Sequence, residues 1–211
     1  MEVISVKLPS REDIINAAAI AKTSYYDAPF ETHKKKLDYG DAVEFLKKLF
    51  LGDRPSDRHE SVIEHLIFTF NIVGVSRALT HQLVRHRIAS YIEKSFRKKR
   101  KIEFLVPESD HKEDYEKAYA ALSNLYNKLI AEGEEPEDAR LVLPQGVLTE
   151  ISMTMNARAL RNFLTQRLAK AAGKEIRILA KLIVQQLIDA GEVDLFFLVE
   201  DIVDKHNKGL L

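Results

Sequence analysis

Four segments of this chain have the composition of β-strands, and stretches of helical character separate them. They are Glu2–Leu8, Leu66–Val73, Ile102–Val106 and Val147–Met155. Four such segments are too few for a large parallel sheet, and the chain contains no G-x-G-x-x-G string of the kind found in dinucleotide-binding folds. We therefore expect an α+β fold, with a mixed or antiparallel sheet and flanking helices, rather than a Rossmann fold.

Local signals place helices between these strands. Ser10 followed by Asp13 is typical of a capping box and predicts a helix that runs to about Ala21. The polar and aromatic stretch Lys22–His33 is expected to be a loop. The expected N-caps of two later helices are Ser76 and Asn156. Apolar periodicity and turn signals predict the other helices: Asp41–Phe50, His111–Glu132, a short one that begins near Pro136 and carries Arg140, Glu175–Ala190, and a last one from about Val193.

The composition limits the classes of function. With 211 residues, of which 45% are hydrophobic, the chain is expected to form a single domain, residues 1–211, with a core of its own. Its 32 basic and 32 acidic residues balance, which speaks against binding bulk nucleic acid. The absence of cysteine excludes disulfides, cysteine-bound metals and a cysteine nucleophile. We find neither a signal segment nor an apolar run long enough to span a bilayer, so a cytoplasmic protein without a membrane partner is expected.

The stretch from Arg85 to Arg97 concentrates cationic and titratable side chains. Consecutive residues of a helix point in different directions, so a helix surface rarely needs Arg85, His86 and Arg87 in succession. A site that grips a polyanionic ligand from several sides does need them. We interpret this stretch as the edge of a nucleotide pocket, and we expect Gln82 to share one helical face with Arg85 and His86.

Ser95 has two functional interpretations besides that of an ordinary loop serine. His86 and Glu93 suggest a hydrolase, but the G-x-S-x-G elbow of hydrolases does not surround Ser95. A hydroxyl two residues before Arg97 is better suited to hold a phosphate, because both side chains can donate hydrogen bonds to it.

The basic run Lys94–Lys101 leaves a nucleic-acid-binding module open as a different class of function. Such a module would need aromatic side chains within the run, and only Phe96 is available. A solvated face or a charged strand edge is the usual meaning of a short basic run. We favour that interpretation for Lys98–Lys101, but not for Arg97.

His59, Glu60, Glu64 and His65 resemble the ligands of a zinc site. The two histidines are six residues apart and would lie on different faces of a helix, whereas a helical zinc pair needs a spacing of four. We therefore expect no metal site here and prefer exposed carboxylates at the start of a helix. A histidine that reaches a cofactor stays possible.

One helix in the second half of the chain carries a candidate anion site. Arg158 lies in the first turn of the helix that Asn156 opens, where the helix macrodipole disfavours a cation. Local conflicts of this kind often mark functional sites, and a helix N-terminus together with an arginine binds anions well. Asn162 follows on the same face, and Arg167 can line the wall of a pocket.

Arg85-His86-Arg87, seven further residues and then Ser95 resemble the signature of the flavin-dependent thymidylate synthase family. Other segments resemble the family in the same order, over roughly residues 55 to 190. They are His59-Glu60-Ser61 with Glu64-His65, Gln82, Ala139 to Pro144, and Asn156-Ala157-Arg158 with Asn162, Phe163, Leu164 and Arg167.

This resemblance implies a homotetramer whose active sites are shared between subunits, with FAD held across them. It implies the reductive methylation of dUMP to dTMP, with 5,10-methylenetetrahydrofolate as carbon donor and NADPH, through FAD, as hydride source. The residues implied near FAD are His59, Ser61, Arg85, His86, Arg87, Glu93, Asn156, Ala157, Arg158 and Asn162. The residues implied around dUMP are Gln82, Leu83, Val84, Arg85, Glu93, Lys94, Ser95, Phe96, Arg97, Arg140 and Arg167.

Within this resemblance, Arg167 is the catalytic residue, because its charge beside the pyrimidine stabilises negative charge as the ring accepts hydride. Ser95, Arg97 and Arg140 can neutralise the nucleotide phosphate. No protein nucleophile is required in this family, which agrees with the absence of cysteine.

The chain departs from the family pattern at several positions. Ile92, Phe96 and Lys98 stand where Asn, Gly and Tyr are usual, His81 replaces a frequent Arg, and Gly173-Lys174 replaces a common Gln-Trp pair. Glycine lets a backbone approach a phosphate closely, so a ring at Phe96 can alter this loop or reach another ligand. These departures leave one alternative, a flavin- and nucleotide-binding protein of the same fold with an altered substrate.

Overall fold

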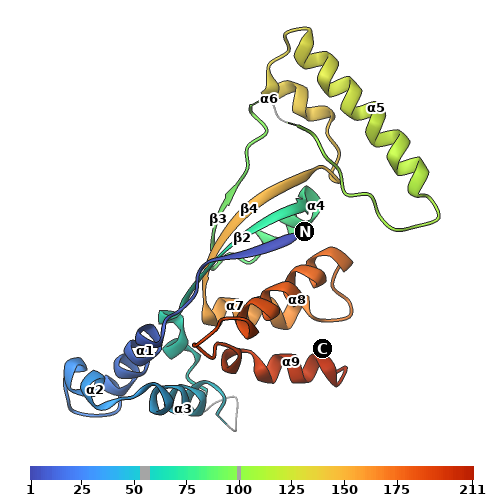
Figure 1. The fold of residues 1–211 in the computed structure, drawn as a ribbon. Helices are drawn as coiled ribbons and strands as arrows, with labels where there is room; N and C mark the ends of the chain where they lie inside the picture. The colour runs from blue at the N-terminus through green and yellow to red at the C-terminus, as the bar shows by residue number, and fades with distance from the viewer. Residues whose placement is uncertain (53–57, 99–100) are drawn as a thin grey trace.

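A four-stranded antiparallel sheet forms the centre of the fold (Figure 1). The computed structural model describes residues 1–52, 58–98 and 101–211. In spatial order the strands are β1 (Glu2–Lys7), β2 (Ile67–Ser76), β4 (Leu148–Asn156) and β3 (Ser90–Glu93). All three neighbouring pairs run antiparallel. The predicted α+β class, with an antiparallel sheet, is therefore confirmed.

The helices and short 3-10 helices follow the capping signals of the sequence. Ser10 forms a capping box with Asp13, and Ser76 accepts a hydrogen bond from the backbone N–H of Leu79, as predicted. The helices are α1 (Arg11–Thr23), α2 (Phe30–Lys36), α3 (Tyr39–Phe50), α4 (Arg77–Leu83), α5 (Lys112–Ala131), α6 (Pro136–Ala139), α7 (Ala157–Arg167), α8 (Lys174–Ile188) and α9 (Glu200–Asn207). The 3-10 helices are η2 (Glu60–His65), η3 (Arg140–Val142) and η4 (Phe196–Leu198). No helix in the described ranges is long and apolar enough to cross a membrane.

The two faces of the sheet differ in chemistry. On β2, Phe68, Phe70 and Ile72 are fully buried and belong to one core that also takes in residues of α1, α3, α7 and α8. The intervening residues carry polar side chains. Thr69 and Thr154 are joined by a hydrogen bond of 3.0 Å across β2 and β4. This alternation fixes the register of the sheet, because a slip by one residue would move the aromatic side chains out of the core.

The long helix α5 stands away from the sheet together with α6 (Figure 1). Most of its side chains are exposed, and Tyr126 is the buried residue of this fully described helix. Tyr119 of α5 stacks on Phe104, with 4.5 Å between the ring centres. A Cβ atom at Gly146 would lie 2.3 Å from the hydroxyl oxygen of Tyr119, so a larger residue here would displace the ring of Tyr119.

Two predicted elements near the start and the end of the chain are wrong. The stretch Lys22–His33 is a loop only over residues 24–29, because α1 continues to Thr23 and α2 begins after Pro29, whose φ of −64° suits a helix entry. His33 faces the interior, so the polar composition concealed a helix. The last helix begins at Glu200, because the chain from Val193 first forms η4.

The strand assignments around residue 100 also need correction. The segment Ile102–Val106 forms no strand, and Phe104 makes only an isolated bridge with Val147 in the described part of the chain. A turn at Pro144 precedes Val147 and ends the pairing on that side. Conversely, the sequence did not predict β3. This short edge strand exposes Ile92 and so lacks the apolar alternation that predicts a strand.

Candidate active site

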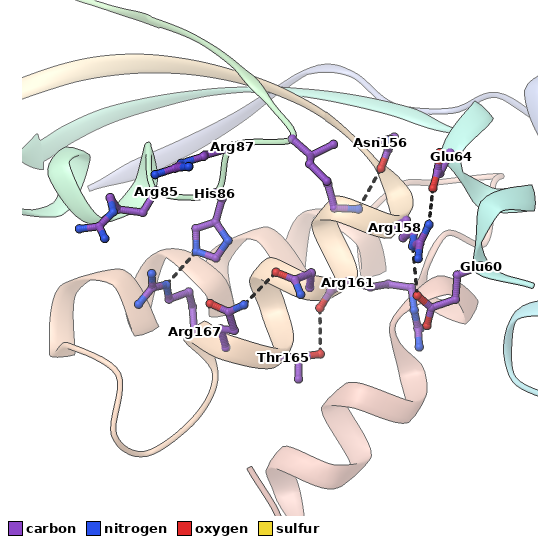
Figure 2. A pocket seen from close by; sticks show the side chains of 14 residues that line it. Glu60, Glu64, Arg85, His86, Arg87, Asn156, Arg158, Arg161, Thr165 and Arg167 are labelled. Atoms are coloured by element: carbon purple, nitrogen blue, oxygen red, sulfur yellow. Dashed lines mark hydrogen bonds and ion pairs between the residues drawn. The ribbon is translucent and has the colours of Figure 1, made fainter. Parts of the chain in front are cut away.

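A cavity of about 650 Å³ lies between the turn after α4, the 3-10 helix η2 and one face of α7 (Figure 2). Charged and amide side chains dominate its lining, and several of them are arginines. The lining residues are Glu60, Glu64, Arg85, His86, Arg87, Ile88, Asn156, Arg158, Ala159, Arg161, Asn162, Thr165, Gln166 and Arg167.

The Arg85-His86-Arg87 segment forms a turn rather than the end of a helix. Helix α4 ends at Leu83, and the backbone N–H of His86 donates to the carbonyl oxygen of Leu83 at 3.1 Å. The expected helical face shared by Gln82, Arg85 and His86 is therefore wrong. The turn still presents successive side chains in different directions, as a grip on an anion requires.

Tyr91 holds this turn against β3. Its hydroxyl group donates to the carbonyl oxygens of Leu83 and His86, at 3.0 and 2.9 Å. Burial raises the pKa of Tyr91 to about 12, so the hydroxyl keeps its proton at neutral pH. The turn that carries the cationic side chains is thus tied to the sheet by the half-buried phenol of Tyr91.

The other end of α4 is held by α8. Ser76 donates to Glu175 twice, through its backbone N–H at 2.8 Å and through its hydroxyl group at 2.5 Å. The same hydroxyl oxygen accepts from the N–H of Leu79 and caps α4. Together, Glu175 and Tyr91 fix both ends of the segment that leads into the cavity.

His86 and Arg167 both line the cavity and are joined by a hydrogen bond (Figure 2). Arg167 Nε donates to His86 Nε2 at 2.9 Å, and the imidazole packs edge-on against Phe163 with 5.0 Å between ring centres. Burial, followed by the charge of Arg167, lowers the pKa of His86 to about 4. His86 is therefore neutral at pH 7 and accepts at Nε2, so its proton lies on Nδ1.

One face of α7 supplies most of the remaining lining. Asn156 caps the helix by accepting from the N–H of Ala159 at 2.8 Å, as predicted. Arg158, Arg161, Asn162 and Thr165 recur at the spacing of one helical face. The N-terminal end of this helix and the arginine in its first turn therefore open into the same cavity.

Arg158 makes ion pairs with both carboxylates of η2. Its Nη1 atom lies 2.6 Å from Glu64 Oε1, and its Nε atom lies 3.4 Å from Glu60 Oε2. The hydrogen bond that Arg158 donates to Glu64 is the largest of the effects that raise the pKa of Arg158. The pairs orient Arg158 along the cavity edge, where its side chain remains half exposed.

A second cluster of cations lies around Phe96 and the base of α6. Arg97 Nη2 and Arg140 Nη2 lie 3.2 and 3.5 Å from the same oxygen, Glu137 Oε1. Ser95 Oγ accepts from the N–H of Arg97 at 3.1 Å. Next to them is a pocket of about 290 Å³ that Arg77, Phe96, Arg140, Leu141, Leu143 and Val147 line.

Comparison with known proteins identifies the family. The model of the family described as Thymidylate synthase complementing protein (Thy1) matches residues 4–190. The chain belongs to the flavin-dependent thymidylate synthase family. A relative with that name from Pyrococcus abyssi is 39% identical over 184 residues, which are 82% of this chain and 73% of the relative. The relative from Pyrococcus furiosus is 42% identical over 64% of this chain, and this alignment spans 60% of that relative. A separate alignment, with the relative from Sulfurisphaera tokodaii, spans 49% of that relative.

The fold of the flavin-dependent thymidylate synthase family is also found in solved structures. One is the crystal structure of the enzyme from Helicobacter pylori complexed with FAD and dUMP. It is 27% identical, with a TM-score of 0.70, and the match covers 93% of this chain and 98% of that one. A second structure of the Helicobacter pylori enzyme with FAD and dUMP gives a TM-score of 0.72 at 26% identity, over 96% of this chain and 99% of that one.

The residues that the family resemblance implies for FAD lie partly in the cavity. Six of them line it: Arg85, His86, Arg87, Asn156, Arg158 and Asn162. Ala157 is buried beside them, whereas His59, Ser61 and Glu93 do not line it. The ring of His59 packs edge-on against Tyr25, 6.1 Å away, and Glu93 lies 3.5 Å from Arg77 and 3.3 Å from the hydroxyl of Thr80.

The residues implied for dUMP fall into two groups in this chain. Gln82, Arg85 and Arg167 line a depression of about 510 Å³ beside the 650 Å³ cavity. Phe96 and Arg140 line the pocket near α6, which shares no lining residue with this depression in the described part of the chain. Leu83 is buried, Val84 is exposed, and Lys94 lies 3.7 Å from Glu150.

Phe96 is largely buried, and only the edge of its side chain reaches the pocket near α6. Its side chain is 4% exposed, and the guanidinium carbon of Arg77 lies 5.8 Å from its ring centre. The ring therefore fills space beneath the loop where most of the family has glycine. Sequence reasoning did not single out Arg77, which borders the pocket with Arg140.

Neither the metal interpretation nor the nucleic-acid interpretation gains support. Within the described residues, no group of three or more His, Asp or Glu side chains could hold a metal ion. Residues 99 and 100 of the basic run lie outside the described part of the chain. Lys94 faces Glu150, and Lys101 lies 2.8 Å from Glu103, so carboxylates partner these cations.

Several cavity residues were missed by sequence reasoning. Arg161, Thr165 and Gln166 belong to the same helix as Arg158 and Asn162, and helical spacing from Arg158 could have found the first two. Tyr91 had no comparable signal, because its hydrogen bonds go to backbone atoms of a turn that the sequence does not specify.

Proposed function

We propose that this chain catalyses the reductive methylation of dUMP to dTMP. The carbon comes from 5,10-methylenetetrahydrofolate and the hydride from NADPH, so that tetrahydrofolate and NADP⁺ are the other products. The observation that carries the proposal is that Arg85-His86-Arg87 faces Arg158 and Arg167 across one cavity in a chain that belongs to this family. The relatives' names and the FAD and dUMP in the Helicobacter pylori structures support it.

The donor set of the cavity fits FAD. Arg85, Arg87 and the N-terminal end of α7 suit the two phosphates, since guanidinium groups and helix N-termini both stabilise phosphate charge. The side-chain amide of Asn162 can pair with the polar edge of a flat ring. It lies next to Gln166, whose Nε2 donates to Asn162 Oδ1 at 2.9 Å. When bound, FAD supplies hydride transfer, and this chain supplies binding and electrostatics.

Arg167 is the residue that we assign to the chemistry. Its charge beside the pyrimidine stabilises the negative charge that develops there as the ring accepts hydride. The neutral imidazole of His86 accepts from Arg167 Nε and leaves the guanidinium Nη atoms to face the substrate. A cationic imidazole could not accept this bond, so the low pKa of His86 supports the arrangement.

We further propose a homotetramer whose subunits share each active site. The implied dUMP residues divide between two pockets of one chain, with Arg167 in one and Arg140 in the other. A nucleotide that touches both groups would therefore bind between subunits, with the phosphate near Arg97 and Arg140 of one and the base near Arg167 of another.

Flavin content and turnover test this function together. The purified protein should be yellow and should release FAD on denaturation. Under anaerobic conditions, dUMP together with 5,10-methylenetetrahydrofolate should reoxidise the reduced flavin, and dTMP should form in equal amount. A colourless protein that cannot be loaded with FAD would contradict the proposal. Reoxidation by other uracil nucleotides but not by dUMP would favour an altered substrate.

A further inference from the structure

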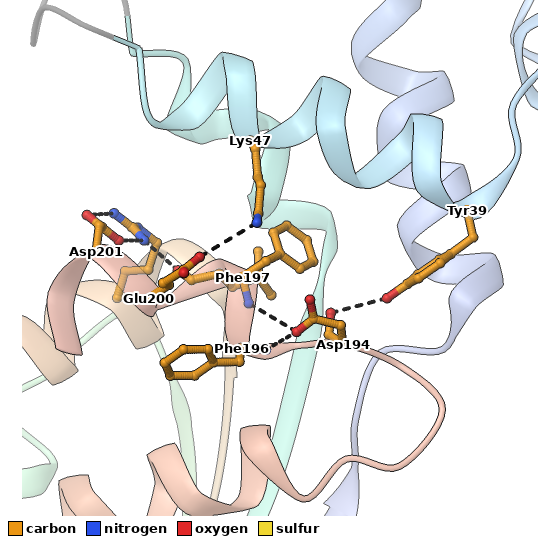
Figure 3. Close-up of polar contacts among 9 residues, drawn as sticks. Tyr39, Lys47, Asp194, Phe196, Phe197, Glu200 and Asp201 are labelled. Atoms are coloured by element: carbon orange, nitrogen blue, oxygen red, sulfur yellow. Dashed lines mark hydrogen bonds and ion pairs between the residues drawn. The ribbon is translucent and has the colours of Figure 1, made fainter. Parts of the chain in front are cut away.

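The last part of the chain contacts the helix that lines the cavity, although the family match ends at residue 190. Residues 191–211 contain η4 and α9, which lie beside α7 (Figure 1). Figure 3 shows the polar contacts that hold this segment against the rest of the fold. The strongest of them comes from Arg161, which is also a lining residue of the cavity.

Arg161 is a buried arginine whose two Nη atoms contact the C-terminal segment, whereas its buried Nε–H has no hydrogen-bond partner among the described residues. Its side chain has a relative exposure of 8%, and its Nη1 and Nη2 atoms donate to the two carboxylate oxygens of Asp201 at 2.7 and 3.0 Å. Nη1 also donates to the carbonyl oxygen of Leu198. The ring centre of Phe50 lies 4.9 Å from the guanidinium carbon. Such a two-pronged pair fixes both the distance and the orientation of the two helices.

Other polar contacts of this segment reach α3 rather than α7 and are more exposed. Lys47 of α3 lies 3.6 Å from Glu200, and both side chains are more than a third exposed. Tyr39 donates to the carbonyl oxygen of Asp194 at 3.2 Å (Figure 3). Exposed pairs of this kind contribute little, whereas breaking a buried pair has a large effect. Arg161–Asp201 is therefore the buried polar contact that ties α9 to α7, beside the apolar packing of Leu198 and Ile202 in the same core.

We propose that Arg161 and Asp201 are positioning residues of the cofactor site, and that residues 191–211 thereby set the affinity for FAD. Arg161 stands between Arg158 and Asn162 on the cavity face of α7, so a shift at Arg161 moves both neighbours. The opposite wall, from Arg85 to Arg87, is held to the sheet by Tyr91 and is joined to the far end of α7 by the Arg167–His86 hydrogen bond. Only the correct placement of α7 brings the two walls to the spacing that one cofactor needs. This inference rests on the proposed function, because it concerns the same FAD site.

The pair can be removed without leaving a buried charge behind. In the double variant Arg161→Met with Asp201→Leu, apolar side chains replace both partners, an exchange that is often neutral for stability. We expect a thermal midpoint close to that of the wild type and a Kd for FAD raised about tenfold, by analogy with outer-shell partners of bound groups. Asp201→Glu, which keeps the charge but lengthens the side chain, should fold and give an intermediate Kd.

Glu200→Gln is the matched control, because it removes the neighbouring ion pair on the same helix. It should leave the Kd for FAD unchanged. A wild-type Kd in both the double variant and Asp201→Glu would overturn the positioning role. Equal weakening by Glu200→Gln would also overturn it, since any loosening of α9 would then suffice. A wild-type protein that binds no FAD would instead refute the proposed function, and this inference with it.

Discussion

Arg167 donates its Nε–H to His86 Nε2 at 2.9 Å, and this bond joins the end of α7 to the turn after α4. The two residues belong to segments that are 81 positions apart in the chain. Each determines a property of the other. The charge of Arg167 helps to keep His86 neutral, and the neutral ring gives Arg167 a fixed acceptor.

Replacing Arg167 by Ala should abolish dTMP formation while FAD remains bound. The loss in kcat should be at least about 100-fold, the usual effect of removing a charged donor that acts on developing negative charge. Turnover and flavin content, measured on the same preparation, check this. Arg167→Lys keeps a cation but not the planar Nε–H donor, so it should be intermediate. Unchanged turnover in Arg167→Ala would refute the assigned role.

Stability should fall as the pH drops from about 6.5 towards 4, because of His86. The pKa of His86 lies near 4 in the folded state and near 6.5 when unfolded. Between these values the unfolded chain binds the extra proton and is stabilised by it, so the free energy of unfolding decreases. Above 6.5 both states are neutral, and His86 adds no pH dependence. Half of the ring is solvated, so the effect will be smaller than the shift alone implies.

Urea unfolding of the wild type and of His86→Gln, followed from about pH 7 to about pH 4.5, measures this contribution. The amide oxygen of Gln can still accept from Arg167 but does not titrate. The difference in stability between the two proteins should therefore change in favour of the variant as the pH falls. Parallel curves over the whole range would show that His86 has an ordinary pKa in the folded protein.

The sequence was informative wherever local chemistry decides the structure. The N-caps Ser10, Ser76 and Asn156 were predicted because each satisfies free N–H groups of its own helix. It failed where partners lie far away in the chain. Strand β3 exists because β4 offers it a paired edge, and α2 buries His33, which its polar composition did not reveal.

The candidate site shows the same division. Helical spacing and motif together located Arg158, Asn162 and Arg167 on one wall of the cavity. The role of Arg161 depends on Asp201, 40 residues away, and no local pattern could reveal this partner. The separation of Arg140 from Arg167 likewise depends on how α6 stands away from the sheet, which only the folded chain determines.

Replacing Tyr91 by Phe should loosen the turn that carries Arg85, His86 and Arg87. The variant loses the hydrogen bonds to two carbonyl oxygens, so the free energy of unfolding should fall by about 1–2 kcal/mol. Urea unfolding measures this, and the Kd for FAD should rise in parallel. Tyr115→Phe on α5 is the control and should change stability by less than about 0.5 kcal/mol. Equal behaviour of the two variants would mean that the Tyr91 hydroxyl holds nothing in place.

Replacing Phe96 by Ala should reduce stability more than it alters the choice of nucleotide. The ring is buried and packs beneath Arg77, so its removal should cost about 3 kcal/mol, at the low end for a buried aromatic side chain that borders open pockets. Thermal unfolding and dUMP titration separate the two effects. A stable variant with a changed preference among uracil nucleotides would show instead that the ring contacts the ligand.

Mixing two inactive variants should restore activity if active sites are shared between subunits. Arg140→Ala removes the proposed phosphate contact from one pocket, and Arg167→Ala removes the proposed base contact from the other. Each homo-oligomer should be inactive. If a site takes Arg140 from one subunit and Arg167 from another, random reassembly of equal amounts makes about a quarter of the sites complete, since each position is intact in about half of the subunits. Co-expression with two affinity tags, followed by a dTMP assay, measures this fraction. A site formed within one chain would stay inactive in every mixture, because each chain then lacks one of the two arginines.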